Sequence, residues 1–138
     1  MKENTMTDLS NLDVTAKAAD GATYTVLHPA DDTELMGGDN KPMTIHLLGA
    51  DSPAFKKAVQ QIINATGTRK KLSADEQERN AVNALVKATV GWSDNWVWDG
   101  KPFLYSVENC RKLYTQRAWI RSQVDEFIAE RSNFFTEA

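Results

Sequence analysis

The period of the hydrophobic pattern changes once along this chain, close to Gly49. Before this residue, in 22–29 and 43–49, side chains alternate with a period of two, as they do in β-strands. After it, apolar residues recur at spacings of three and four, which is typical of amphipathic helices. A strand pair is only marginally stable alone, so helices must pack on one of its faces. The pattern therefore predicts an α+β fold that is mostly helical, with a short antiparallel strand pair near the N-terminus.

Four helices are predicted after Gly49. They cover residues 51–67, 73–92, 106–116 and 117–135. The second begins with a capping box, in which the side chains of Ser73 and Glu76 each accept a hydrogen bond from the other's backbone. The apolar stripes of the four helices predict the following buried residues: Phe55, Val59, Ile62, Leu85, Trp92, Leu113, Trp119, Val124 and Phe127.

The N-terminal segment differs in composition from the rest of the chain. Residues 1–20 are polar, small and acidic, and they offer little apolar surface to bury. This composition predicts a flexible N-terminal arm. Residues 21–138 contain no internal repeat and no second boundary, so they are predicted to form a single α+β domain.

Charge and hydropathy argue against two kinds of partner. The formal net charge is −3, so the chain has no general attraction to nucleic acid. The basic segment 68–71 is followed closely by acidic residues, which cancel most of its field beyond a Debye length of about 8 Å. No apolar run approaches the roughly 20 residues that span a bilayer, so no membrane partner is expected. The single cysteine, Cys110, fits a reducing compartment, and the cytoplasm is the expected location.

Catalytic signatures are missing from the sequence. It has no phosphate-binding loop, dinucleotide fingerprint or nucleophile elbow. His28 and His46 lie on the two predicted strands and would be neighbours if these strands pair. No cysteine or carboxylate stands at ligand spacing beside them, so surface histidines are favoured over a metal site. The sequence thus predicts a protein that is not an enzyme and that uses no cofactor.

Three of the four tryptophans lie in "GWSDNWVWDG", residues 91–100. Trp96 and Trp98 share one face of an extended segment, and the pair Asp99–Gly100 favours a tight turn. A small hairpin that caps the helices is therefore predicted. For Trp96 and Trp98, packing and partner contact are both open, because tryptophan is common in cores and in interface hot spots. The candidate protein-binding residues are Trp96, Trp98, Phe103, Tyr105, Phe134 and Phe135.

The order of these segments resembles a known family. "GW", "YS", "EN", "LY", "IR", "QVDEFI" and "ERSNFF" follow one another over residues 91–135, and "TIHLLGADSPAFKKA" precedes them from Thr44. This arrangement is similar to the small tail assembly chaperones of long-tailed bacteriophages and prophages. The similar stretches span residues 22–135 and include no catalytic signature.

The resemblance implies a function. Family members coat the long, hydrophobic tape measure protein and keep it soluble until subunits of the tail tube protein polymerise around it. They are not enzymes, they act in the host cytoplasm, and they often self-associate, so a homo-oligomer is among the expected states. The alternative interpretation is a structural subunit of the virion, in the head-tail region or the tail.

Overall fold

The structure is a computed structural model that describes residues 7–67 and 71–135. Over these residues the chain forms five α-helices, two short 3-10 helices and five strands, so the predicted α+β class is confirmed. The elements, in chain order, are η1 (Leu9–Asn11), α1 (Val14–Asp20), β1 (Ala22–Thr25), β2 (Thr44–Leu47), α2 (Pro53–Thr66), α3 (Ala74–Ala88), β3 (Thr89–Trp92), β4 (Val97–Trp98), β5 (Lys101–Pro102), α4 (Val107–Gln116), α5 (Ala118–Ala129) and η2 (Arg131–Phe134).

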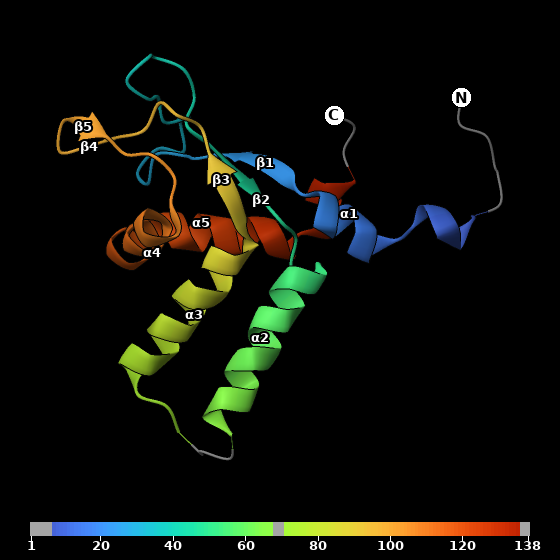
Figure 1. Cartoon of the computed structure of the whole chain (residues 1–138). Coiled ribbons are helices and arrows are strands. Elements are labelled where there is room, and N and C mark those ends of the chain that lie inside the picture. The colour runs from blue at the N-terminus through green and yellow to red at the C-terminus, as the bar shows by residue number, and fades with distance from the viewer. Residues whose placement is uncertain (1–6, 68–70, 136–138) are drawn as a thin grey trace.

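A three-stranded antiparallel sheet, in the order β1–β2–β3, packs on α4 and α5 (Figure 1). The predicted pairing of the two N-terminal strands is confirmed, and its register places Tyr24 opposite Ile45. On the other side of β2, Ile45 pairs with Trp92 of β3. The main core lies between this sheet and the helices. Its fully buried large side chains include Tyr114, Ile45, Leu47, Leu113, Val26 and Val124.

β3 replaces the last turn of a helix that the sequence predicts over 73–92. α3 ends at Ala88, and the backbone of Thr89 is already extended. The hydroxyl of Thr89 donates to the carbonyl of Leu85 at 2.8 Å and can accept from the hydroxyl of Tyr114 at 2.7 Å. Thr89 and Val90 are β-branched, and the free edge of β2 pairs with Thr89, Gly91 and Trp92. Residues 89–92 therefore form a strand, although the spacing of the apolar residues is that of a helix.

The helix predicted over 117–135 is also shorter in the structure. α5 ends at Ala129, and η2 follows it. The side chain of Glu130 accepts a hydrogen bond from the backbone N–H of Ser132 at 3.3 Å. The carbonyl of Phe127, in the last turn of the helix, accepts from the backbone N–H of Glu130 at 3.3 Å and from the side-chain amide of Asn133 at 2.9 Å.

Part of the predicted N-terminal arm packs on the domain. Asp13 caps α1 through the backbone N–H of Ala16. Within α1, Ala18 is buried, and its carbonyl accepts a hydrogen bond from the backbone N–H of Gly49 at 2.9 Å. The composition of residues 1–20 does not predict this contact between α1 and Gly49. Residues 1–6 lie outside the described part of the chain.

α2 and α3 run side by side and project away from the sheet (Figure 1). The predicted capping box of α3, between Ser73 and Glu76, is confirmed. α2 packs along one side only, and Ala58 is its sole buried residue. This geometry leaves Val59 and Ile62 half-buried, which corrects their predicted place in the core.

The other core predictions divide into two groups. Leu85, Leu113 and Val124 are buried as predicted. The remaining four are half-buried and pack against the edge of the core: Phe55, Trp92, Trp119 and Phe127. Their rings are wide enough to contact the core and still reach the surface.

Candidate partner-binding pocket

β4 and β5 form the predicted hairpin, and its turn is Asp99–Gly100. The backbone φ angles are 54° at Asp99 and 75° at Gly100. Two positive φ angles define a type I′ turn, whose twist matches that of the flanking strands. The backbone N–H of Phe103 donates to the carbonyl of Trp96 at 2.9 Å, so the pairing continues beyond the two short strands. The hairpin thereby holds its aromatic side chains in fixed positions.

These side chains form one cluster around Trp92. The Trp92 ring stacks on Trp96 and on Phe103, with centroids 4.8 and 5.4 Å away. The ring of Tyr105 meets Trp92 edge-on at 5.1 Å. Trp98 joins through Phe103, at 4.9 Å. The four aromatic residues that the sequence singles out in this segment, Trp96, Trp98, Phe103 and Tyr105, are thus brought together by the fold.

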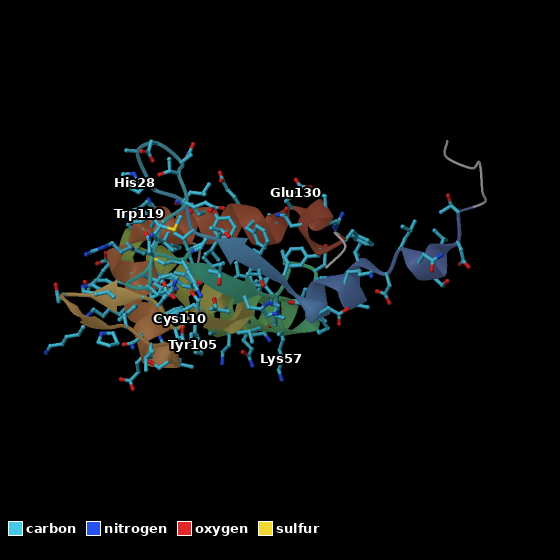
Figure 2. All side chains as sticks on the ribbon, turned by 90° about the horizontal axis from the view of Figure 1, so that it is seen from above. His28, Lys57, Tyr105, Cys110, Trp119 and Glu130 are labelled. Carbon is cyan, nitrogen blue, oxygen red and sulfur yellow. The ribbon has the colours of Figure 1, made fainter. Side chains whose placement is uncertain are left out.

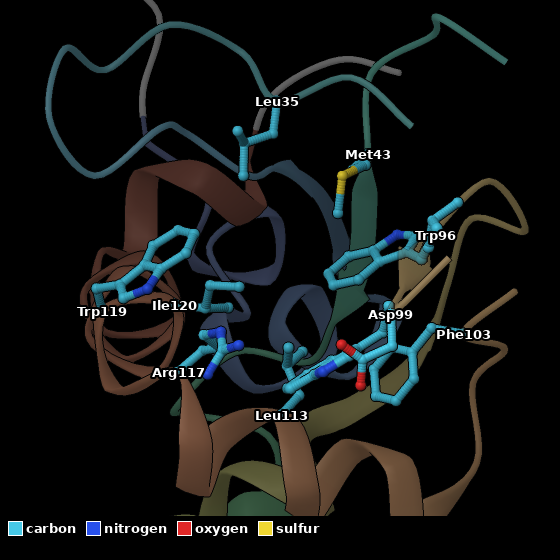
Figure 3. A pocket seen from close by; sticks show the side chains of 11 residues that line it. Leu35, Met43, Trp96, Asp99, Phe103, Leu113, Arg117, Trp119 and Ile120 are labelled. Atoms are coloured by element: carbon cyan, nitrogen blue, oxygen red, sulfur yellow. The ribbon is translucent and has the colours of Figure 1, made fainter. Parts of the chain in front are cut away.

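A cavity of about 310 Å³ opens beside this cluster, between the hairpin and the start of α5 (Figure 3). Figure 3 shows Trp96 and Trp119 on opposite sides of the cavity, with Leu35 and Met43 above them. We call this cavity the tryptophan pocket. Its lining residues are Leu35, Met43, Trp96, Val97, Trp98, Asp99, Phe103, Leu113, Arg117, Trp119 and Ile120. The size and the apolar lining suit one or two large apolar side chains.

The tryptophan pocket is bordered by positive charge. The Nζ atom of Lys112 and the Cζ atom of Arg117 each lie 4.5 Å from the centroid of the Trp98 ring. Such contacts stabilise a cation at the electron-rich ring face. The lining of the pocket contains one carboxylate, that of Asp99 in the hairpin turn. The border therefore carries a net positive charge.

A loop fixes the hairpin from the far side. The side-chain amide of Asn95 donates to Asp39 Oδ1 and to the carbonyls of Lys41 and Pro42, at 2.9, 2.9 and 3.2 Å. The carbonyl of Asn95 accepts from the backbone N–H of Gly38 at 2.9 Å. The bond from Asn95 lowers the pKa of Asp39 below its usual range. Asn95 is buried, so this network holds the backbone next to Trp96 in one conformation.

The candidate binding residues differ in how deeply they are buried. Trp96, Phe103 and Phe134 are buried and belong to the core, and Trp96 and Phe103 present only a small part of their rings to the tryptophan pocket. The role of these three residues in binding stays a prediction. They are buried because the hairpin folds onto the domain and η2 folds onto α5, which a linear pattern does not reveal. Trp98, Tyr105 and Phe135 are half-buried, and their role in binding stays a prediction.

The predicted residues do not all lie together. Phe134 belongs to a second cluster, where its ring lies 5.6 Å from Phe127. Phe127 in turn lies 4.9 Å from Tyr24. Phe135 borders a small crevice beside α1, together with Val14 and Ala18. This second cluster joins α1, β1 and the end of α5, and it takes no part in the tryptophan pocket.

Of the residues that line the pocket, the sequence singles out Trp96, Trp98 and Phe103 for binding and misses the others. Leu35 lies inside a turn-rich connection, where no periodicity marks it, and Met43 begins the second predicted strand. Arg117 is the first residue of a predicted helix, and nothing in the sequence marks it as a binding residue. Trp119 is predicted as core, but it forms one wall of the pocket.

The polar groups of the core are structural. Burial raises the pKa of the Cys110 thiol to about 11, so it stays protonated at neutral pH. Burial likewise raises the pKa of Tyr105 and Tyr114. Neither the thiol nor the phenols therefore offers an ionised nucleophile near neutral pH.

The two histidines lie apart. The register of the sheet places His46 opposite Thr23, whereas His28 follows β1 and accepts a hydrogen bond from the backbone of Ala30 at 3.1 Å. The pairing of the strands does not make the imidazoles neighbours, because His28 lies beyond the paired segment. Within 7–67 and 71–135, no group of three or more His, Cys, Asp or Glu residues has the geometry of a metal site.

Comparison of the chain with protein-family models, curated proteins and solved structures found no match. None of the helices in the part of the chain that the structure describes is both long and apolar enough to cross a membrane. Most of the basic segment 68–71 falls outside the described residues.

Proposed function

We propose that the protein is a phage tail assembly chaperone that binds an apolar helical segment of the tape measure protein in the tryptophan pocket. The observation that carries the proposal is the pocket itself, an open apolar cavity with three tryptophans in its lining. Tryptophan is the residue most enriched among interface hot spots. The resemblance of residues 22–135 to this chaperone family supplies the identity of the client.

In this proposal, one or two large side chains of the client enter between Trp96 and Trp119. The client's flanking carboxylates lie near Lys112 and Arg117, which favours acidic residues beside the apolar ones. The chaperone acts in the host cytoplasm and is displaced when the tail tube protein assembles on the tape measure protein. The proposal involves no catalytic step and no cofactor.

A matched pair of substitutions tests the client site. Val97 lines the pocket and is 53% exposed, whereas Val107 is 52% exposed and is absent from the pocket lining. Val97→Asp should weaken binding of a co-expressed tape measure fragment about 10-fold or more, because it places a carboxylate in the apolar contact. Val107→Asp should leave the affinity unchanged. Equal affinity of both variants and the wild type would exclude this pocket as the client site.

Burial of Trp96 decides which variants are informative. Replacing Trp96 removes a core side chain, so loss of binding in that variant would report unfolding. The thermal unfolding of both valine variants is the control, since their half-exposed positions should tolerate the change.

Purified tails separate the chaperone from a structural subunit of the virion. An assembly chaperone leaves the finished tail, so quantitative mass spectrometry of mature virions should detect only traces of this chain. A high, fixed copy number in mature virions would replace the proposal with the structural-subunit interpretation.

A further inference from the structure

The segment before α1 exposes two leucines. Leu9 is 77% exposed and Leu12 is 49% exposed. Both lie in residues 7–13, "TDLSNLD", which contain two aspartates and no basic residue. Large apolar side chains on an acidic segment of this kind are typical of a short stretch that docks into a groove. We call residues 8–13 the leucine segment.

The leucine segment cannot reach the tryptophan pocket of its own chain. It is tethered by α1, whose Ala18 packs against Gly49: a Cβ added at Gly49 would lie 2.8 Å from the Cβ of Ala18. Figure 1 places α1 and the β4–β5 hairpin at opposite ends of the molecule, and Figure 2 places the arm and Trp119 at opposite ends as well. A leucine segment that binds in the tryptophan pocket must therefore belong to another molecule.

The leucine segment and the tryptophan pocket are complementary in chemistry. The pocket offers an apolar cavity, and Lys112 and Arg117 at its border outnumber the carboxylate of Asp99. The segment offers two leucine side chains and the carboxylates of Asp8 and Asp13, which leave it with two negative charges. Apolar burial and opposite charges both favour their association.

We infer that the leucine segment of one copy binds in the tryptophan pocket of a second copy. Because the two surfaces lie at opposite ends of the molecule, each chain then binds one neighbour at each end. Such a head-to-tail contact produces rings or open chains instead of closed two-fold dimers. The bound segment also covers the site proposed above for the client, so self-association and client binding compete. The inference concerns the pocket and the arm alone, and it holds whatever the client is.

Sedimentation of the full chain over a range of concentrations tests the inference. The wild type should form species larger than a dimer as its concentration rises. Leu9→Ser combined with Leu12→Ser should weaken this association about 10-fold or more, because burial of two leucines is lost. Ile63→Ser is the matched control, since Ile63 is 55% exposed on α2 and should leave the association unchanged. A wild type that stays monomeric throughout, or a double variant that associates like the wild type, would overturn the inference.

Site-directed cross-linking tests the contact itself. A Leu12→Cys chain and a Val97→Cys chain, mixed under mild oxidation, should form a disulfide-linked pair. A mixture of Leu12→Cys with Ile63→Cys should not, and the native Cys110 is buried and should not interfere. Equal cross-linking in both mixtures would show that the arm has no preferred site and would overturn the inference.

The client assay keeps the two proposals separate. If both are correct, the double leucine variant should bind the tape measure fragment at least as well as the wild type, because the competitor is removed. Val97→Asp should lose both client binding and self-association. Loss of client affinity in the leucine variant would contradict the competition, whereas client binding unaffected by Val97→Asp would count against the proposed client site only.

Discussion

Gln123 shows how much one polar side chain determines in this fold. Its amide oxygen accepts hydrogen bonds from the hydroxyl of Tyr24 at 2.7 Å and from the backbone N–H of Leu27 at 3.0 Å. Its amide nitrogen donates to the carbonyl of Leu27 at 2.8 Å. The side chain therefore pairs with the segment after β1 as a neighbouring strand would, and it joins α5 to the sheet.

Gln123→Leu should lower the free energy of unfolding by about 2 kcal/mol, because three half-buried polar groups lose their partner. Chemical denaturation measures this loss. Gln116→Leu makes the same change at an exposed position and should cost less than about 0.5 kcal/mol. Similar losses in both variants would mean that the side chain of Gln123 makes no special contribution.

Asp51 and Arg131 form an ion pair that should respond to pH. Nε and Nη2 of Arg131 donate to the two carboxylate oxygens of Asp51 at 2.7 and 3.1 Å. These hydrogen bonds hold the pKa of Asp51 below its ordinary value of 3.8. A lowered pKa in the folded state gives stability that is present above pH 4 and is lost as the pH falls through the folded value.

Arg131→Gln should accordingly lower the unfolding temperature at pH 7, and the difference from the wild type should close as the pH falls below about 4. Lys57→Gln, which removes a charge from an exposed position of α2, should keep the pH dependence of the wild type. A difference between Arg131→Gln and the wild type that is independent of pH would show that the ion pair does not stabilise the fold.

At the scale of elements, the sequence predicts best where the signal is local. The capping box at Ser73 and the turn at Asp99–Gly100 depend on residues close together in the chain, and both are confirmed. The end of α3 at Ala88 depends on β2, which lies about forty residues earlier and offers an edge to β3. The tryptophan pocket combines four separate segments, so its lining could not be derived from spacing.

The contact between the loop before β2 and the hairpin predicts the effect of one added methyl group. A Cβ at Gly37 would lie 2.2 Å from the carbonyl oxygen of Asn95, whereas at Gly38 its nearest contact would be a methyl group of Val97, at 3.2 Å. Gly37→Ala should therefore cost about 2–3 kcal/mol. Gly38→Ala should cost less than about 1 kcal/mol, and thermal unfolding compares the two. The reverse order would mean that the loop is not seated on Asn95.

At the scale of the whole molecule, the N-terminal residues divide into two parts with different roles. Val14–Asp20 form α1, which packs through Ala18 beside Gly49 and Phe134. The preceding residues that the structure describes contain no buried side chain. The sequence predicts one arm over 1–20, because a single buried alanine leaves no periodic signal.

Truncation should separate these parts. Removing residues 1–12 should leave the free energy of unfolding unchanged within about 0.5 kcal/mol, because the side chains of the described residues 7–12 are all exposed. Removing residues 1–20 should cost about 2–3 kcal/mol, because it exposes Phe134 and the backbone N–H of Gly49. Equal stability of the two truncated chains, measured by chemical denaturation, would show that α1 does not stabilise the domain.

The parallel stack of Trp92 on Trp96 gives the molecule an optical property of its own. With ring planes only 22° apart and centroids 4.8 Å apart, the electronic transitions of the two indoles couple. Coupled indoles absorb left- and right-handed light unequally, so the stack contributes circular dichroism that separated indoles lack. Since Trp96 also lines the pocket, a molecule that enters and tilts this ring alters the spectrum, and occupancy can be followed without any added label.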